Sequence, residues 1–524
     1  MSTAVQNNEG ADLKTWVGVA GALIGAFMAI VNIQITNAAL LDIEGGIGTG
    51  GANGAWISTS YLIGEIIVIP LCDFLSRVFS TRRFLLVNTA LFLIFSVACA
   101  FAGNLEQMIV LRALQGFTGG VLIPVAFTLV ATTLPMSQRP LGMAGFSLAA
   151  TFAPAIGPTI GGWLSDNYGW EFIFYVNLVP GLVMLSALFW SLKPAPMQLK
   201  LLKTGDWTGI ATLAVGLGAL QTVLEEGNIH DWFGSQLIVN LAIVAAIFLG
   251  VFLWIELHKE NPVVNLRLLT RRNFGTGTLS NFMLGFGLYG AGFVLAQYLA
   301  RTQGYNAEQI GKVVMWTGLP QLLVVPFVPF MIKRVNVRWM AAAGLALFGV
   351  SNLWNTNLSG LTGGDQLLVP NIMRAIGLAL VMTPLSALAM TDIAREETAA
   401  ASGLFNMTRN LGGAFGTAVL VTFLTKREQF HSNVINSHVE LTDPATVQRI
   451  EALKQHFLSE GVSDVAAATR QALIAIGKTI HHQAELMGFA DTFGLLGAVV
   501  MLGAVSILFM RNMKQAPAGG GAAH

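Results

Sequence analysis

SQLIVNLAIVAAIFLGVFLWIEL, residues 235–257, is a run of mostly aliphatic and aromatic side chains with a single charged group, Glu256. A helix of about 20 predominantly apolar residues spans the hydrocarbon core of a bilayer, so this run predicts a transmembrane helix. Similar runs recur along the whole chain. We expect fourteen transmembrane helices, at residues 15–40, 55–76, 83–102, 107–131, 140–163, 170–192, 205–224, 235–257, 275–300, 308–330, 338–356, 365–390, 400–425 and 488–511.

The composition agrees with a chain that faces lipid over most of its surface. Of its 524 residues, 54% are hydrophobic and 11% are charged, whereas soluble domains carry about 25% charged residues. The formal net charge of +1 gives no indication of nucleic-acid binding. The two cysteines, Cys72 and Cys99, lie in apolar runs and predict no disulfide framework.

The sequence lacks the usual motifs of soluble catalysis. It has no P-loop, no dinucleotide-binding fingerprint and no convincing nucleophile set, and its glycine-rich run at 45–51 follows no predicted strand. The histidines lack a convincing metal-ligand spacing, so we expect no metal and no cofactor. ATP-driven transport is disfavoured, and we expect a transporter and not an enzyme. A polytopic membrane enzyme or receptor remains an alternative, for which only residues 426–487 offer a soluble segment.

Lysine and arginine are unevenly distributed between the short loops on the two sides of the predicted helices. Cytoplasmic loops carry the excess of these residues in membrane proteins. One alternating set of loops contains only Arg301. The other set, which we therefore place in the cytoplasm, contains Arg77, Arg82, Arg83, Arg139, Lys193, Lys200, Lys203, Lys259, Arg267, Arg271, Arg272, Lys333, Arg334, Arg338 and Arg395. Both termini then lie inside, as an even number of helices requires, and a bacterial inner-membrane location is expected.

An internal repeat relates two parts of the chain. Residues 68–92 (VIPLCDFLSRVFSTRRFLLVNTALF) align without gaps with residues 324–348 (VVPFVPFMIKRVNVRWMAAAGLALF). Pro70 matches Pro326, and both segments end in Ala-Leu-Phe. Shared bilayer composition is the alternative explanation, although composition alone does not supply a matched proline. The repeat predicts two similar six-helix halves with an extra pair of helices at 205–257 between them.

This interpretation divides the chain into six parts. They are an N-terminal six-helix bundle at 1–200, two extra transmembrane helices at 201–260, the first five helices of a C-terminal bundle at 261–425, a periplasmic helical loop at 426–487, the last transmembrane helix at 488–511 and a cytoplasmic tail at 512–524. The expected fold class is an all-α membrane protein.

Several short motifs resemble those of a known transporter family. Residues 153–162 (APAIGPTIGG) are similar to the antiporter motif GPxxGG, and residues 170–181 (WEFIFYVNLVPG) approach WxxxFxxNxPxG with the proline one position late. Residues 111–116 (LRALQG) resemble RxxQG, and NPVVNL at 261–266 and NMTR at 406–409 also fit. The chain thus resembles the fourteen-helix drug:proton antiporters of the major facilitator superfamily, the EmrB/QacA type.

The resemblance implies the major facilitator fold and efflux of small organic molecules driven by inward proton flow. Exporters of the EmrB kind work with a periplasmic membrane-fusion adaptor and an outer-membrane channel, so we expect both as partners. A metabolite transporter on the same scaffold, including an importer, is the main alternative. The GPxxGG motif argues against import.

Glu65 lies in the middle of the second predicted helix. A carboxylate at that depth is costly and usually functional, and burial favours its neutral form, so it could load and release protons. Arg112, in the fourth predicted helix, also needs acceptors inside the bundle, and the family resemblance implies a part in proton coupling. We therefore assign proton coupling to Glu65 and Arg112. A structural ion pair between Glu65 and an arginine is the alternative, and pairing with Arg112 is feasible.

The first predicted helix departs from the family pattern LDxTxxNxAxP. It reads VNIQITNAALL at 31–41, with Asn32 at the carboxylate position and Gln34 at the threonine position. Asparagine cannot ionise, which removes an anion that would attract cations, so amphipathic weak acids or neutral compounds are favoured as substrates. Interhelical hydrogen bonding is the alternative role of these amides. We place the substrate cavity at Asn32, Gln34, Asn37, Gln115 and Gln297.

Two further segments are candidates for conformational change. In the fifth helix, small residues allow close packing and proline bends the helix, so we expect gating residues at Pro154, Gly157, Pro158, Gly161 and Gly162. The loop after the second helix departs from the family's GxLxDRxGRR. A charge-pair latch with rearranged signs would use Asp73, Arg77, Arg82 and Arg83. Ordinary close packing and a positive-inside anchor are the respective alternatives.

Residues 426–487 form the one long soluble segment. Helical apolar spacing at 447–458 and 465–480 predicts two helices in it, and the orientation above places them outside. A cap or lid over the outer mouth is one interpretation of this segment, and a docking surface for the adaptor is the other.

Overall fold

The computed structural model describes residues 11–49, 53–135, 137–259, 262–440 and 442–512, and these ranges contain helices and no strand. The N-terminal half comprises α1 (Leu13–Ala38), α2 (Leu40–Gly46), α3 (Trp56–Val68), α4 (Cys72–Phe79), α5 (Thr81–Cys99), α6 (Leu105–Gly119), α7 (Leu122–Thr133), α8 (Arg139–Tyr168), α9 (Phe172–Tyr175) and α10 (Leu178–Ser191). The linking region comprises α11 (Leu201–Thr204), α12 (Trp207–Glu226) and α13 (Gln236–His258).

The C-terminal half comprises α14 (Arg272–Arg301), α15 (Ala307–Val314), α16 (Leu319–Val324), α17 (Val328–Arg334), α18 (Val337–Trp354), α19 (Leu368–Ala389), α20 (Thr398–Ser437), α21 (Pro444–Ser459) and α22 (Val465–Leu508). Short 3-10 helices are η2 (Ile69–Leu71), η3 (Trp232–Gly234), η4 (Leu266–Thr270), η5 (Met315–Thr317), η6 (Val325–Phe327), η7 (Asn355–Asn357) and η8 (Arg395–Glu397).

Eleven helices of the described ranges are long and apolar enough to cross a membrane. They are Leu13–Ala38, Thr81–Cys99, Leu105–Thr133, Arg139–Tyr168, Phe172–Ser191, Trp207–Glu226, Gln236–His258, Arg272–Arg301, Glu308–Arg334, Leu368–Ala389 and Val465–Leu508. The other three predicted spans correspond to the α3–η2–α4 segment, α18 and α20, which are helical as well. The chain is an all-helical membrane protein, and the full count of fourteen spans stays a prediction.

The aligned prolines of the internal repeat occupy equivalent places in the structure. Pro70 lies in η2, between α3 and α4, and Pro326 lies in η6, between α16 and α17. Proline lacks the backbone donor that a regular α-helix needs, so each helix tightens into a 3-10 turn at the matching position. The two halves therefore share a 3-10 turn at the matching position, in addition to the similar sequence around it.

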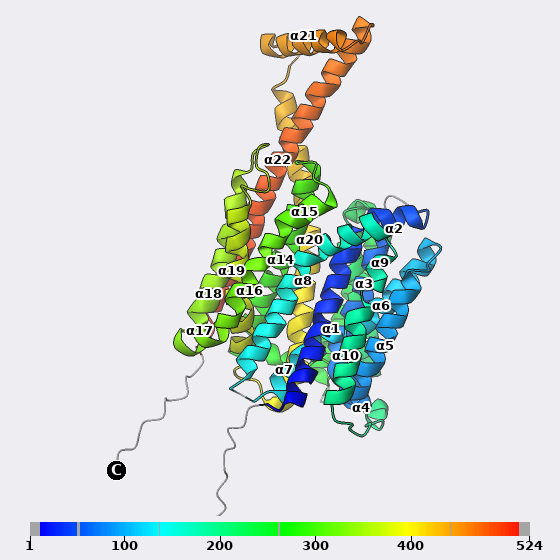
Figure 1. Cartoon of the computed structure of the whole chain (residues 1–524), viewed down its shortest axis with the longest axis vertical. Coiled ribbons are helices and arrows are strands. Elements are labelled where there is room, and N and C mark those ends of the chain that lie inside the picture. The colour runs from blue at the N-terminus through cyan, green and yellow to red at the C-terminus, as the bar shows by residue number, and fades with distance from the viewer. Residues whose placement is uncertain (1–10, 50–52, 136, 260–261, 441, 513–524) are drawn as a thin grey trace, which may run out of the picture.

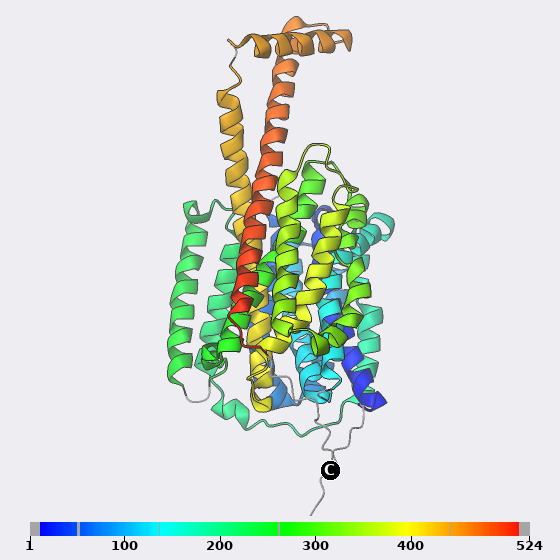
Figure 2. The ribbon, with the colours of Figure 1, turned by 90° about the vertical axis from the view of Figure 1, so that its left-hand side faces the viewer.

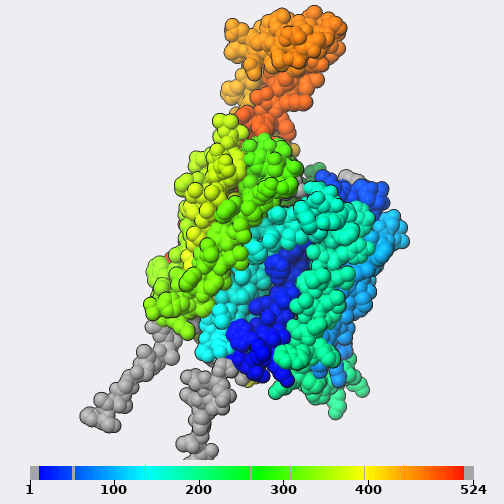
Figure 3. Space-filling view, viewed as in Figure 1, coloured from blue at the N-terminus to red at the C-terminus, as the bar shows by residue number. Residues whose placement is uncertain are grey.

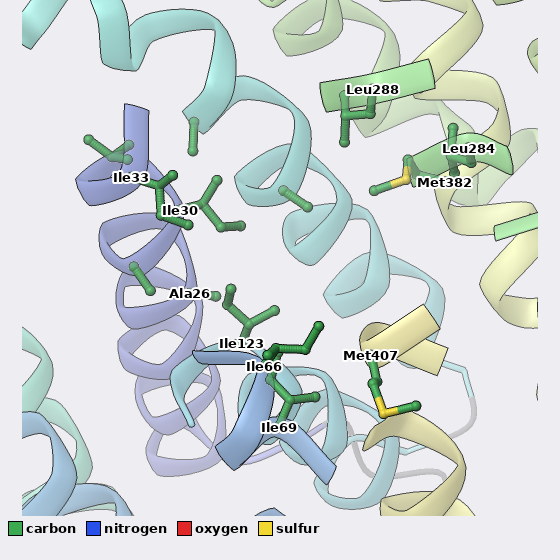
Figure 4. Packing of buried hydrophobic residues seen from close by; sticks show 14 of the residues in the cluster. Ala26, Ile30, Ile33, Ile66, Ile69, Ile123, Leu284, Leu288, Met382 and Met407 are labelled. Atoms are coloured by element: carbon green, nitrogen blue, oxygen red, sulfur yellow. The ribbon is translucent and has the colours of Figure 1, made fainter. Parts of the chain in front are cut away.

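The helices pack as two groups with the extra pair at one edge. In the N-terminal half α1 packs on α8 and α10, and α3 on α6; in the C-terminal half α14 packs on α20 and α22, and α18 on α19. The extra helices α12 and α13 pack on each other, and α12 also contacts α3 and α20. Figure 4 shows apolar side chains from both halves facing the centre, including Ile66 and Ile123 from one half and Leu284 and Met407 from the other.

Two helices continue well beyond the bundle, and α21 lies across their far end (Figures 1 and 2). We call residues 426–437 and 465–487 the stalk, and α21 its tip. The helices α20 and α22 run unbroken through the predicted span boundaries at 425 and 487, which stay predictions of where the membrane ends. The apolar run ends there, but the backbone hydrogen bonds of a helix continue until a breaker or a cap appears.

The helical spacing predicted within this segment agrees with the structure. Residues 447–458 lie in α21, and residues 465–480 form the first part of α22. Asp443 caps α21 by accepting from the backbone of Thr446, and Asp464 caps α22. The predicted division at 260–261, the first ten residues and most of the predicted tail, 513–524, lie outside the described residues.

Glycines let pairs of helices touch backbone to backbone in both halves. A methyl group at Gly161 of α8 would lie 2.7 Å from the carbonyl oxygen of Ile35 on α1. A methyl group at Gly412 of α20 would lie 2.1 Å from the carbonyl oxygen of Phe282 on α14. Such approach is how membrane helices gain packing energy without a hydrophobic driving force between them.

A side chain at Gly161 should therefore destabilise the protein. Gly161→Leu is expected to lower the free energy of unfolding by about 1–3 kcal/mol, as overpacking does, which thermal unfolding of the detergent-purified protein measures. Gly250→Leu on α13 is the matched control, because nothing lies within 4 Å of that position. Equal melting temperatures for the two variants would contradict the packing assigned to α1 and α8.

Candidate functional site

Glu65 lies on α3 where the two halves meet, and it is buried, with 3% of its surface exposed. Its Oε1 atom accepts a hydrogen bond of 3.0 Å from Nδ2 of Asn410 on α20. The second oxygen, Oε2, has no hydrogen-bond partner within the described ranges. The carboxylate of Glu65 thus links the N-terminal half to the C-terminal half through one oxygen, and its other oxygen accepts no described hydrogen bond.

Close helix packing fixes the position of Glu65. A methyl group at Gly64 would lie 2.2 Å from the carbonyl oxygen of Ala113 on α6. A methyl group at Gly120, just after α6, would lie 2.9 Å from the Cα atom of Glu65. The two glycines therefore let the backbone around Glu65 lie directly against α6.

Two buried arginines belong to the surroundings of Glu65, and neither forms a described ion pair with it. Arg409 precedes Asn410 on α20 and donates a hydrogen bond of 2.8 Å to Oδ1 of Asn406. The other is Arg112 on α6. The predicted alternative of a Glu65–arginine strut has no ion pair to support it among the described residues.

Arg112 is held by neutral oxygens. It donates to Oδ1 of Asn32 at 2.9 Å, to Oε1 of Gln115 at 2.7 Å and to the carbonyl oxygen of Ile57 at 3.2 Å. Its guanidinium also lies 4.4 Å from the centre of the Tyr61 ring. Pairing with Glu65, which the sequence left open, is not observed, because these acceptors occupy the guanidinium instead.

Asn32 therefore has a clear structural role. It is 1% exposed on α1, and its side-chain oxygen accepts from Arg112 on α6. The departure from the family pattern replaces a carboxylate at this position by an amide, so a buried cation is held without a countercharge. An aspartate here would meet Arg112 directly and would not stand free to attract a cationic substrate.

The C-terminal half holds a polar contact related to that of Glu65. Gln321, which the repeat aligns with Glu65, lies on α16 and accepts a hydrogen bond from Thr151 on α8 of the other half. Each half thus presents one buried polar residue at the repeat-related position to a helix of the opposite half. One of these residues can ionise and the other cannot.

Arg374 corresponds to Arg112 in the repeat. It is 6% exposed on α19, and its described hydrogen bond, of 3.5 Å, goes to the carbonyl oxygen of Leu288. The sequence analysis did not place Arg374 in the site, although Arg374-Ala375 resembles Arg112-Ala113. Asn410 and Arg409 were also missed, although NMTR at 406–409 was the available signal.

The structure separates the other predicted cavity residues. Gln115 joins Asn32 at Arg112, and Gln34 packs against Gly157 of α8. Asn37 is exposed at the C-terminal end of α1 and accepts a hydrogen bond from Ser58. Gln297 is half-buried on α14. Two hollows of about 410 and 310 Å³ open near the predicted outer loops, and neither is lined by a predicted cavity residue.

The predicted gate and latch residues lie in regular helices. Pro154 and Pro158 are inside α8, which runs through them unbroken, and Gly157 and Gly161 face α1. Asp73 forms an ion pair of 2.9 Å with Arg77 one turn later on α4. The other two predicted latch residues take no part in this ion pair. Arg82 donates to the carbonyl oxygen of Phe189 on α10, and Arg83 is exposed.

The extra helices contain buried acids that the sequence analysis did not use. At one end Asp206 is 2% exposed and pairs with Lys259 at 2.6 Å, beside the buried carboxylate of Glu256. At the other end Glu226 is fully buried next to the partly exposed Glu225. Acidic residues at the ends of the apolar runs 205–224 and 235–257 were the sequence signal for both groups.

Comparison with known proteins finds a matching transporter family, and relatives that align over nearly the whole chain. The sequence model of the Major Facilitator Superfamily matches residues 22–269 and 277–427. A colistin resistance protein, EmrB, of Acinetobacter baumannii is 32% identical over 501 residues, which are 95% of this chain and 97% of that protein. A fatty acid resistance protein, FarB, of Neisseria gonorrhoeae is 29% identical over 507 residues, 97% of each chain. A multidrug export protein, EmrB, of Escherichia coli is 28% identical over 503 residues, 96% of each chain.

Removing the acceptor at position 32 should expose the cost of burying Arg112. Asn32→Leu is expected to lower the free energy of unfolding by about 1–3 kcal/mol, the usual cost of an unsatisfied buried donor. Asn32→Asp keeps the acceptor and adds a countercharge, so its melting temperature should equal or exceed that of the unmodified protein. Asn37→Leu, at an exposed position of the same helix, is the control. An unchanged melting temperature for Asn32→Leu would contradict this role.

Proposed function

We propose that this chain, which belongs to the Major Facilitator Superfamily, exports organic compounds across the bacterial inner membrane in exchange for protons. The relatives named for multidrug export and for resistance support efflux as the direction of transport. Fourteen spans with both termini in the cytoplasm fit the distribution of lysine and arginine. The two halves, the extra pair and the stalk are then the functional divisions of the chain.

The observation that carries this proposal is the hydrogen bond between Glu65 and Asn410. Protonation of the unpartnered Oε2 neutralises the carboxylate, so the hydrogen bond from the Asn410 amide to Oε1 loses its charge assistance and becomes weaker. Because the two residues lie on opposite halves, this change acts on the contact that has to open and close during alternating access. We assign the proton to Glu65, and we assign Arg112 the role of tying α1 to α6 beside it.

The charges near the centre favour weak acids or neutral compounds as substrates. Arg112, Arg374 and Arg409 are all buried, and none of them forms an ion pair with a described carboxylate. A carboxylate substrate that entered between the halves would meet these guanidinium groups, whereas a cation would have Glu65 alone as a partner. The name of the gonococcal relative, a fatty acid resistance protein, agrees with this class.

Helix α8 and the α4 ion pair are proposed to take part in the movement. The prolines of α8 leave backbone carbonyls without partners inside the helix, so bending there costs less than elsewhere. Gly157 and Gly161 let α8 slide against α1 without side-chain clashes. The ion pair of Asp73 and Arg77 lies at the predicted cytoplasmic end of α4, where movement of the halves would reach it.

Glu65→Gln should abolish proton-driven export and leave substrate binding measurable, since glutamine keeps the size and the Asn410 contact but cannot carry a proton. Uptake into inverted vesicles would be followed with dansylglycine as the acid, phenylnaphthylamine as the neutral compound and ethidium as the cation. The wild type should transport the acid or the neutral compound better than the cation.

The control for Glu65→Gln is Glu308→Gln, which removes an exposed carboxylate paired with Lys312. That variant should transport as the wild type does. Full proton-driven uptake by Glu65→Gln would rule out Glu65 as the proton carrier. Preference of the wild type for ethidium would overturn the substrate class.

The stalk and its tip are proposed to dock a periplasmic adaptor that leads to an outer-membrane channel. Figure 3 shows this part projecting away from the membrane bundle. Exposed apolar side chains lie on it, at Val447 on the tip and at Val465, Leu473 and Ile474 on α22. Apolar groups that project from the bundle and stay uncovered are typical of interaction surfaces, and exporters of the EmrB kind have such an adaptor.

Replacing residues 439–463 with a short Gly/Ser linker tests this role, because it removes the tip and keeps both stalk helices. Proton exchange in inner-membrane vesicles should be unchanged. Co-purification of the adaptor and export across the outer membrane should be lost. Adaptor binding that survived the replacement would place the docking surface elsewhere and leave the tip as a cap.

A further inference from the structure

Glu226, at the end of α12, is a fully buried carboxylate that bonds the extra helices to the N-terminal half. Its side chain has no exposed surface, and Oε1 accepts a hydrogen bond of 2.8 Å from Oγ1 of Thr59 on α3. Thr59 is itself 2% exposed. The contact therefore joins α12 to the same helix that carries Glu65.

The second oxygen of Glu226 has no hydrogen-bond partner among the described residues. The nearest described cationic group is His230, whose Nε2 atom is 3.8 Å from it and whose side chain is 32% exposed. That distance is too long for a hydrogen bond. The Nε2 atom of His230 is itself buried without a described hydrogen-bond partner, although part of the side chain is exposed. A partly exposed group that can bind a proton thus lies next to Oε2.

The other charged neighbour of Glu226 is Glu225, on its own helix. Glu225 accepts a hydrogen bond of 3.0 Å from Gln221 of the same helix. In the described parts of α3, α13 and α20, which pack on α12, no lysine or arginine forms an ion pair with Glu226. A carboxylate buried this deeply without a cation is expensive in its ionised form.

The position of Glu226 relates it to Glu65. Thr59 precedes Glu65 by six residues of α3, which is about 9 Å along a helix axis. By the predicted orientation, α12 ends and α3 begins on the external side, so Glu226 lies nearer to the outside than Glu65 does. Protons that drive export enter from that side.

We propose that Glu226 is an outer proton-binding site that receives protons from the external solution through His230 and delivers them to Glu65. The proton passes from external water to the imidazole, from the imidazole to Oε2 of Glu226, and through water between the parted halves to the Glu65 carboxylate. No other species is consumed. This inference rests on the proposed proton exchange, and it gives the two extra helices a function in it.

Glu226→Gln is the informative variant, because glutamine can still accept the Thr59 hydrogen bond but cannot bind a proton. Dansylglycine uptake would be measured in inverted vesicles, where the external face of the protein faces the lumen, at several luminal pH values. We expect uptake near neutral luminal pH to fall on the order of tenfold, within the effect of a positioned proton-transfer group. Lowering the luminal pH should restore it, because bulk water then supplies protons to Glu65.

Glu308→Gln, which removes an exposed carboxylate paired with Lys312, is the control and should behave as the wild type at every luminal pH. His230→Gln should show a smaller shift in the same direction. If Glu226 is only a structural link, Glu226→Gln will match the wild type across the whole pH range, while Thr59→Val and Glu226→Leu will lower the yield of folded protein. That result would overturn the inference.

The outcome also separates this inference from the proposed function. If uptake by the wild type needs no proton gradient, proton-driven export itself is wrong. If the wild type needs the gradient and Glu65→Gln fails, but Glu226→Gln has a wild-type pH profile, the outer site alone is rejected.

Discussion

The hydrogen bond from Asn410 to Glu65 joins the two halves of the protein at a carboxylate that no described cation neutralises. In a bilayer, polar groups have to be satisfied inside the protein, because lipid offers them nothing. Glu65 can meet this requirement by pairing across the interface or by taking up a proton. The protonation state of Glu65 is thereby linked to the contact between the two halves.

The rest of the centre follows from the same constraint. Arg112 is kept in place by two amides and a carbonyl, and Arg409 by an amide. With Asn32 at the carboxylate position of the family pattern that the sequence resembles, the positive charge of Arg112 is not cancelled by a described neighbour. Glu65 is left as the central carboxylate of this group, and it lies on the surface shared by the halves. In the proposed transport cycle, this site binds a proton in one step and an acidic or neutral compound in another.

The sequence predicted that Glu65 and Arg112 lie inside membrane spans, but it did not predict which residues they contact. Apolar runs placed Glu65 and Arg112 inside spans, and the repeat matched Pro70 with Pro326, which the structure places in equivalent 3-10 turns. The rotation of one helix against another depends on side-chain packing between distant segments, so Asn410 and Asn32 could not be named as partners. The helices within the stalk segment were predicted, but their continuity with α20 and α22 was not. Hydrophobicity indicates where a helix leaves the lipid. It does not indicate where the helix ends, and α20 continues to Ser437 while α22 begins at Val465.

Proton release on substrate addition tests the central claim most directly, because it needs neither a membrane nor a partner. Purified protein in weakly buffered detergent solution near neutral pH would receive dansylglycine, phenylnaphthylamine or ethidium while a pH indicator is recorded. The account predicts that the acid or the neutral compound displaces a proton from the wild type and that no release occurs when position 65 cannot ionise. Substrate binding by the wild type without any proton release would contradict it.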